Sequence, residues 1–314
     1  MKHVNILLAL SLAACSSGAT SSYLPGKTAN GTAAATSDDR AATVRGVVNR
    51  ASTQKYIYVG DAKNDQLLVY PQGVSNPSPI RTVPLGDSPN GIAVDGSGHV
   101  FVALWNTSTV AVFSRGATSL VRTISTGIYK PTGVAVDENN VLYVASHCQT
   151  VGQPAFVAEF EPGSDTPDGT QLVAPQGDAI EGVAVRNGVA FLDVNRGAGG
   201  LAILYSNGLP TQVQIGLAVG SGLALDNAGN LYAANAATLS EFAPPSYQNV
   251  HDTYYGTGAG IRYVGRGGDG TIYAPYGSPK GTTPTVVVTP TNGQPSYTIT
   301  DGLSASSPSG AAAD

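Results

Sequence analysis

Short runs of alternating apolar and polar residues recur along most of the chain. Residues 91–95 read Gly-Ile-Ala-Val-Asp, a Gly-rich turn follows, and residues 100–103 return as Val-Phe-Val-Ala. Two such runs joined by a tight turn predict a β-hairpin. Similar pairs of runs occupy residues 133–145 and 222–234, and a shortened pair occupies residues 182–192. The pattern therefore predicts a repeated hairpin.

The repeat has a fixed length. An aromatic residue stands at the centre of the second run in six copies, at Tyr58, Phe101, Tyr143, Phe191, Tyr232 and Tyr273. Successive aromatics are 41 to 48 residues apart, and each repeat carries a third apolar run and a fourth, more polar one. A strand repeat of this length is typical of a propeller blade. We predict an all-β fold, a six-bladed β-propeller of four-stranded antiparallel blades over residues 43–300.

The ends of the repeat array are less regular. The first inner strand is expected near residues 43–48, and residues 301–314, rich in Ser, Ala, Gly and Pro, are predicted to be a disordered tail. No shared strand that would latch the ring is evident, unless a segment before residue 43 or after residue 301 supplies it. We found no stretch with the 3.6-residue periodicity of an amphipathic helix.

The first residues indicate export. Lys2 precedes an apolar run that is too short to span a bilayer, which is typical of a signal peptide over residues 1–14. The run ends in Leu-Ala-Ala-Cys, which resembles the lipobox of bacterial lipoproteins and implies an acylated Cys15; an ordinary signal peptide with a chance cysteine is the alternative. Residues 15–42 are small and polar and are predicted to be a flexible tether. The expected location is the bacterial cell envelope, lipid-anchored at the outer-membrane periplasmic leaflet or the cell surface.

The charge balance and the cysteine count limit the classes of partner that the chain can bind. Sixteen basic residues face 21 acidic ones without a Lys/Arg run, which argues against nucleic acid as a partner. If Cys15 carries lipid, Cys148 is left without a disulfide partner. We interpret Cys148 as an inert thiol and expect a monomer.

The copies Pro-Asn-Gly-Ile-Ala-Val-Asp at residues 89–95 and Pro-Thr-Gly-Val-Ala-Val-Asp at residues 131–137 resemble NHL repeats. Families with similar repeats form six-bladed propellers. They include bacterial extracytoplasmic NHL-type proteins, the gluconolactonase/senescence-marker group and the streptogramin lyases. The resemblance to the gluconolactonase group implies metal ligands at the position before each inner-strand glycine. Here that channel rim reads Val47, Asn90, Thr132, Glu181, Ser221 and Arg262.

This rim holds one carboxylate beside a guanidinium, whereas a hard cation needs several oxygen ligands. We therefore predict no metal and no cofactor, and expect Glu181 to interact with Arg262. The lyase-like alternative needs a His/Glu pair, for which His147 and Glu181 are the candidates; a surface histidine is the simpler interpretation of His147.

The loops after the second strands and before the inner strands are expected to share one face of the propeller, which we call the channel face. Its candidate ligand-binding residues are Trp105, Asn106, Tyr129, His147, Asn195, Arg196, Asn235 and Tyr276. Trp105, the only tryptophan, suits a binding face or a cap on the core of blade two.

The sequence favours a lipid-anchored envelope propeller that binds a protein, peptide or glycan through its channel face, without assigned catalytic residues. The alternative is a metal-dependent lactonase or lyase that uses Glu181, Asn90 and His147. A purely structural envelope component is a third interpretation, so whether the chain is an enzyme stays open.

Overall fold

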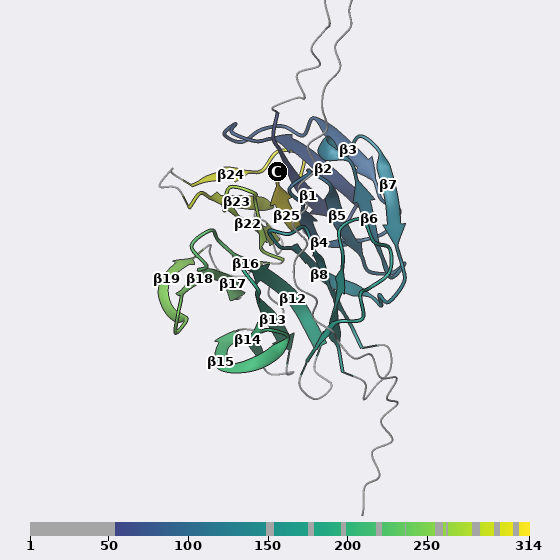
Figure 1. Ribbon diagram of the computed structural model, residues 1–314. Helices are drawn as coiled ribbons and strands as arrows, with labels where there is room; N and C mark the ends of the chain where they lie inside the picture. Colours follow the sequence, from purple (N-terminus) through teal and green to yellow (C-terminus); the bar gives the residue numbers. More distant parts are fainter. Residues whose placement is uncertain are drawn as a thin grey trace, which may run out of the picture. The chain divides into compact units, whose positions relative to one another are not determined.

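The fold is a ring of six antiparallel sheets, seen in the computed structural model (Figure 1). The structure describes residues 54–148, 154–174, 179–195, 199–217, 222–235, 237–254, 260–261, 263–277, 283–291, 296–303 and 308–314. The predicted all-β, six-bladed propeller with four-stranded blades is confirmed. Within these residues the only helix is a single 3₁₀ turn, η1 (Arg115–Ala117), and none is long and apolar enough to cross a membrane.

Each sheet contributes one strand to each of four concentric positions. The inner strands are β25 (Pro308–Ala313), β4 (Pro89–Val94), β8 (Pro131–Val136), β12 (Ala179–Arg186), β16 (Leu223–Leu225), and the split pair β20 (Gly260–Ile261) and β21 (Gly265–Arg266). The second strands are β1 (Tyr56–Asp61), β5 (Val100–Leu104), β9 (Leu142–Ser146), β13 (Val189–Asn195), β17 (Leu231–Asn235) and β22 (Ile272–Gly277).

The third strands are β2 (Gln66–Pro71), β6 (Thr109–Phe113), β10 (Phe156–Phe160), β14 (Gly200–Ser206), β18 (Thr238–Ala243) and β23 (Thr285–Thr289). The outer strands are β3 (Arg81–Pro84), β7 (Leu120–Ile124), β11 (Gln171–Val173), β15 (Leu209–Leu217), β19 (Gln248–Tyr254) and β24 (Tyr297–Ile299). The order of runs predicted within a repeat is therefore the order observed.

The prediction that residues 301–314 form a disordered tail is wrong for the last of these residues, which belong to the first sheet. Residues 308–313 do not form part of a disordered tail; they are β25, the fully buried inner strand that pairs with β1. Figure 1 shows β25 lying beside β1, so one sheet combines an early and a late segment of the chain. This pairing latches the ring through the segment after residue 301. Residues 43–48, which were expected to form the inner strand of the first blade, lie outside the described residues. In the structure β25 forms the inner strand of that blade.

Inner strands approach one another closely around the axis, in the order β25, β4, β8, β12, β16, β21 and back to β25. A β-carbon at Gly91 would lie 2.8 Å from the backbone of Gly133, and one at Gly133 would lie 3.2 Å from Gly182. Only glycine allows the sheets to come this close. The inner-strand glycines are thus a packing requirement of the ring.

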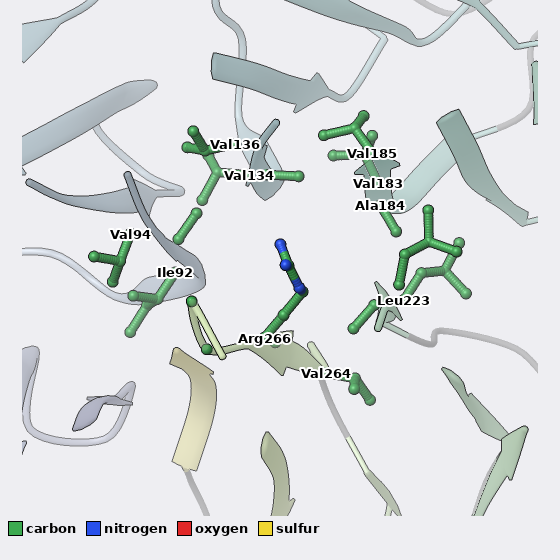
Figure 2. Close-up of a pocket in the computed structure, with 17 residues that line it drawn as sticks. Ile92, Val94, Val134, Val136, Val183, Ala184, Val185, Leu223, Val264 and Arg266 are labelled. Atoms are coloured by element: carbon green, nitrogen blue, oxygen red, sulfur yellow. The ribbon is translucent and has the colours of Figure 1, made fainter. Parts of the chain in front are cut away.

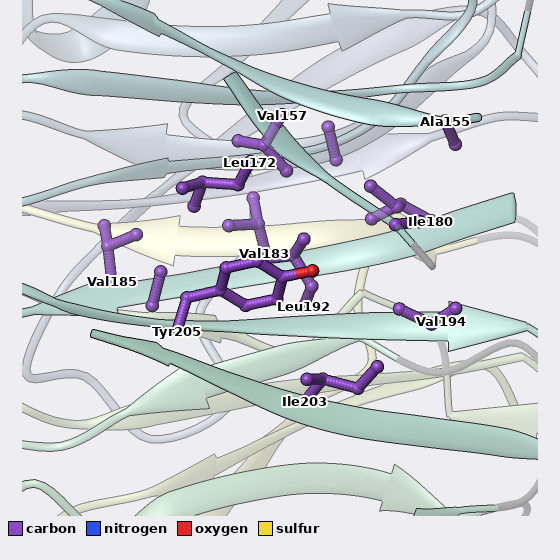
Figure 3. Close-up of a cluster of buried hydrophobic side chains, with 13 residues drawn as sticks. Ala155, Val157, Leu172, Ile180, Val183, Val185, Leu192, Val194, Ile203 and Tyr205 are labelled. Carbon is purple, nitrogen blue, oxygen red and sulfur yellow. The ribbon is translucent and has the colours of Figure 1, made fainter. Parts of the chain in front are cut away.

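Hydrophobic side chains gather in six clusters, one at each interface between neighbouring sheets. Figure 3 shows the cluster between the third and fourth sheets, where Val157 and Leu172 meet Ile180, Leu192 and Tyr205. The second-strand aromatics take part in this packing, as predicted: all six belong to such clusters, and Tyr58, Phe191 and Tyr273 are completely buried. These clusters join each blade to its neighbours.

Candidate functional site

Two channel-face side chains from neighbouring blades stack on each other. Trp105 follows β5 and His147 follows β9, and their ring centroids are 5.6 Å apart with planes at 77°. Both side chains are half-buried. Such an edge-to-face contact orients both rings while it leaves part of each open to solvent. Trp105 is not among the residues of the six hydrophobic clusters.

A lysine lies over the tryptophan. The Lys130 Nζ is 5.6 Å from the centroid of Trp105 and 5.7 Å from that of Tyr129, distances at which an ammonium is attracted to an aromatic face. Lys130 has a left-handed backbone (φ 42°), and its amide donates to the Ser108 hydroxyl at 3.1 Å. The four residues Trp105, Tyr129, Lys130 and His147 form what we call the aromatic cluster.

A buried carboxylate holds the loop that carries Trp105. Asp87, 3% exposed, accepts hydrogen bonds from the Asn106 side chain at 2.7 Å and from the Thr107 amide and hydroxyl, each at 2.7 Å. Burial by itself raises the pKa of Asp87, but the hydrogen bonds from Thr107, Asn106 and Ser88 outweigh it, so the pKa lies below its usual range. Asn106, a predicted ligand-binding residue, therefore supports the loop with its amide group.

His147 has a second neighbour. Its Nδ1 is 3.4 Å from the Sγ of Cys148, a half-buried free cysteine. Glu181 instead accepts a hydrogen bond from the Asn195 side chain at 3.3 Å. Among the described contacts none joins His147 to Glu181, so the His/Glu pair of the lyase-like alternative is not assembled in this structure.

The channel rim connects the blades. The Asn90 side chain donates to the Pro131 carbonyl of the next sheet at 3.2 Å, and the buried Thr132 hydroxyl donates to the Ile180 carbonyl of the following one at 2.8 Å. Each of these residues thus bonds to the inner strand of its neighbour.

Three predicted rim residues, Val47, Ser221 and Arg262, lie outside the described residues, as does the predicted Glu181–Arg262 interaction. In the first sheet the position before the inner-strand glycine belongs to Ser309, because Gly310 is that glycine.

The described rim residues do not fit a divalent cation. They provide one carboxylate, Glu181, while Ca²⁺ takes about six to eight oxygen ligands, usually with several carboxylates. No group of three or more His, Cys, Asp or Glu side chains with metal-binding geometry occurs among the described residues.

The other predicted channel-face residues are spread over three sheets. Asn195 ends β13, Asn235 ends β17, and Tyr276 lies on β22, where it packs against a hydrophobic cluster. Arg196 lies outside the described residues. The structure therefore brings together Trp105, Tyr129 and His147 from the predicted set. Asp87, which sequence analysis missed, supports the loop that carries Trp105; an aspartate one residue before a serine in a loop is too common a signal to reveal that role.

Comparisons with known proteins agree with the fold. A family model described as SMP-30/Gluconolactonase/LRE-like region matches residues 47–148, a segment that includes the whole aromatic cluster. A crystal structure of a Bacteroides caccae protein of unknown function has a TM-score of 0.61 at 11% identity, covering 83% of this chain and 99% of that one. No curated protein matches the sequence. The observed sheets and these two matches lead to the same conclusion: the chain is a six-bladed propeller, similar over residues 47–148 to the SMP-30/gluconolactonase/LRE-like region.

Proposed function

We propose that this protein is a binding module that holds a protein, peptide or glycan on its channel face through the aromatic cluster. The observation that carries the proposal is the half-buried Trp105, stacked on His147 with Lys130 over its ring. Tryptophan and tyrosine bury much area at little entropic cost, which is why they dominate binding hot spots. The ammonium of Lys130 adds a site for an acidic group of the ligand.

Preorganisation supports the same proposal. Asp87 fixes the loop after β5, the His147 amide donates to the Tyr129 carbonyl at 3.0 Å, and the Lys130 amide is bonded to Ser108. A surface whose loops are already ordered loses less entropy when it binds. The aromatic groups of two adjacent blades are thus held in place before a ligand binds.

The proposal can be tested with the chain's own fluorescence, because Trp105 is the only tryptophan. Purified protein is titrated with defined amino-sugar oligosaccharides and with acidic and basic model peptides while tryptophan emission is followed. We expect a saturable change with one class of probe, and calorimetry should show that Trp105→Ala weakens that binding about tenfold or more.

The matched control is Tyr254→Ala, which removes an exposed aromatic (62% exposed) from the outer strand β19. Binding by this variant should equal that of the wild type. Equal affinity of Trp105→Ala and wild type for every bound probe would refute the proposed role of the cluster.

We further propose that the propeller is lipid-anchored at the bacterial cell envelope through Cys15. The support is the lipobox-like sequence at residues 12–15, which lies outside the described residues. Metabolic labelling with a radioactive fatty acid should mark the wild type and not Cys15→Ser. Labelling of both proteins would contradict the anchor. The resemblance to NHL repeats likewise stays a prediction.

One observation favours a second function, a metal-dependent lactonase or lyase: the family match over residues 47–148. Its candidate residues are Glu181, Asn90 and His147. Asn90 is already bonded to Pro131 and Glu181 to Asn195, which speaks against this alternative. Calorimetry with Ca²⁺, Mg²⁺, Mn²⁺ and Zn²⁺, followed by a lactone-hydrolysis assay, separates the two. Metal binding that Glu181→Gln abolishes, together with turnover, would favour the enzyme.

A further inference from the structure

One inner strand places a charge in the apolar channel. The inner-strand residue just before the turn position is aliphatic in the other blades, namely Val94, Val136, Val185, Leu225 and Ala313. In the sixth sheet this position belongs to Arg266 on β21, which pairs with Ile272 of β22 as Leu225 pairs with Leu231 in the fifth sheet. Figure 2 shows its side chain extending toward the middle of the ring of labelled aliphatic residues.

The Arg266 guanidinium is poorly satisfied by the protein. One Nη donates to the Asn227 side-chain oxygen at 2.6 Å, and the buried Nε has no hydrogen-bond partner. Among the described residues, no carboxylate oxygen lies within 4.0 Å of it. The residue is half-buried, and a buried N–H without a partner carries a desolvation cost that an anion bound there would remove.

A second arginine reinforces the positive potential. Arg186 ends β12 at the turn position that holds Asp95, Asp137, Asp226 and Asp314 in other blades. Its Nε is also buried and unpartnered. Burial lowers the pKa of Arg266, repulsion from Arg186 lowers it further, and attraction from Asp226, Asp269 and Glu138 opposes both.

The acidic groups nearby do not cancel this charge by contact. The Glu138 carboxylate accepts a hydrogen bond from the Asn187 amide at 3.0 Å, and Asp226 accepts bonds from its own turn at Ala228 and Asn230. These carboxylates are therefore engaged with backbone amides at the turns, whereas the guanidinium of Arg266 points into the channel.

Space for a ligand lies beside the guanidinium. The inner strands line a partly open cavity of about 70 Å³ that runs from Ile92 and Val134 to Arg266, Gly267 and Gly268. One water molecule needs roughly 10–15 Å³ of such space, so the cavity can hold a group of several atoms. A carboxylate or phosphate group matches the planar donor fork of arginine.

We propose that this end of the channel is a binding site for a small oxyanion, a carboxylate or a phosphate, held by Arg266 and attracted by Arg186. The site lies at the end of the channel opposite the aromatic cluster and is independent of the binding function proposed above. Aliphatic side chains line the cavity beside the guanidinium, and the N–H groups that Asn227 leaves unused would provide the specific contacts.

The experiment is calorimetric titration of the purified full chain with inorganic phosphate and, separately, with acetate, at constant ionic strength set with chloride. We expect saturable binding of at least one anion. Arg266→Leu, which installs the aliphatic residue of the fifth blade, should weaken it about tenfold or more, because a charge-assisted hydrogen-bonding group is lost. The two arms decide whether the site selects phosphate or carboxylate.

Arg122→Met serves as the matched control, because Arg122 lies on the outer strand β7, away from the channel, and forms an ion pair with Asp165 at 3.0 Å. It should bind the anion as the wild type does. If Arg266→Leu fails to fold, Arg266→Lys keeps the charge without the fork and should bind measurably weaker. Absence of saturable binding by the wild type, or unchanged binding by a folded Arg266 variant, would overturn the proposal.

Discussion

The closing strand can be tested at a single position, Gly310 on β25. A β-carbon there would overlap the Asn90 carbonyl oxygen and lie 3.3 Å from the Ile92 amide nitrogen. Both are backbone atoms of β4, so neither can rotate away. Overpacking costs typically about 1–3 kcal/mol, and the smaller unfolded-state entropy of alanine returns about 0.4–1 kcal/mol. We expect Gly310→Ala to lower the free energy of unfolding by about 1–2 kcal/mol.

Urea unfolding followed by circular dichroism measures this difference, with Gly216→Ala as the control. Gly216 lies on the outer strand β15, and a β-carbon there has no atom within 4 Å. The control should unfold at the wild-type urea concentration or slightly above it. If Gly310→Ala unfolds together with Gly216→Ala, with the same denaturant dependence, β25 does not pack against β4 and the ring is not closed in this way.

Three further changes probe the loops and the blade interfaces. Asp87→Ala leaves the hydrogen-bond donors of the Trp105 loop without an acceptor, so the free energy of unfolding measured in urea should fall by about 1–3 kcal/mol. A fall below roughly 0.5 kcal/mol, the size of an ordinary surface substitution, would contradict the supporting role of Asp87. Tyr58→Phe removes a hydroxyl that donates to Asp314 at 3.2 Å and accepts from a backbone amide at 2.8 Å, and should cost about 1–2 kcal/mol by the same measurement. Burial, with repulsion from nearby carboxylates, raises the pKa of Glu159 from 4.5 to about 7. The folded state then keeps a proton that the unfolded chain releases, so the free energy of unfolding should fall between pH 4.5 and 7, and Glu159→Gln should reduce this fall; an unchanged pH dependence would contradict the shift.

The architecture could be predicted because a propeller repeats one local pattern. The alternation around Phe101 and Tyr143 and the glycines before each inner run recur at a constant spacing, and each copy makes the same contact with its neighbour. The closing strand escaped prediction because Pro-Ser-Gly-Ala-Ala-Ala has neither β-branched nor aromatic residues. Yet residues 310–314 repeat the inner-strand pattern of residues 91–95, from glycine to aspartate, with alanines in place of the larger side chains. Small residues suit a strand next to the axis, so this pattern could have identified the closing strand.

The candidate site was less accessible to sequence reasoning. Trp105 and His147 meet because β5 and β9 belong to adjacent blades, and only the angle between blades brings their rings to 5.6 Å. The same holds for Lys130, which precedes β8 of the next blade and whose ammonium lies 5.6 Å from the Trp105 ring centroid. Residue type marked Trp105 as a candidate, but its partners depend on geometry that no single repeat encodes.

Closure of the first sheet has a consequence for the order of synthesis. Tyr58 and Asp314, which touch in the finished ring, are 256 positions apart, so β1 leaves the ribosome long before β25 exists. Until then β1 presents an unpaired edge, which is a template for pairing with other chains. A nascent chain interrupted before residue 308 therefore does not become a slightly smaller propeller. It is left with an open seam at which neighbouring molecules can join.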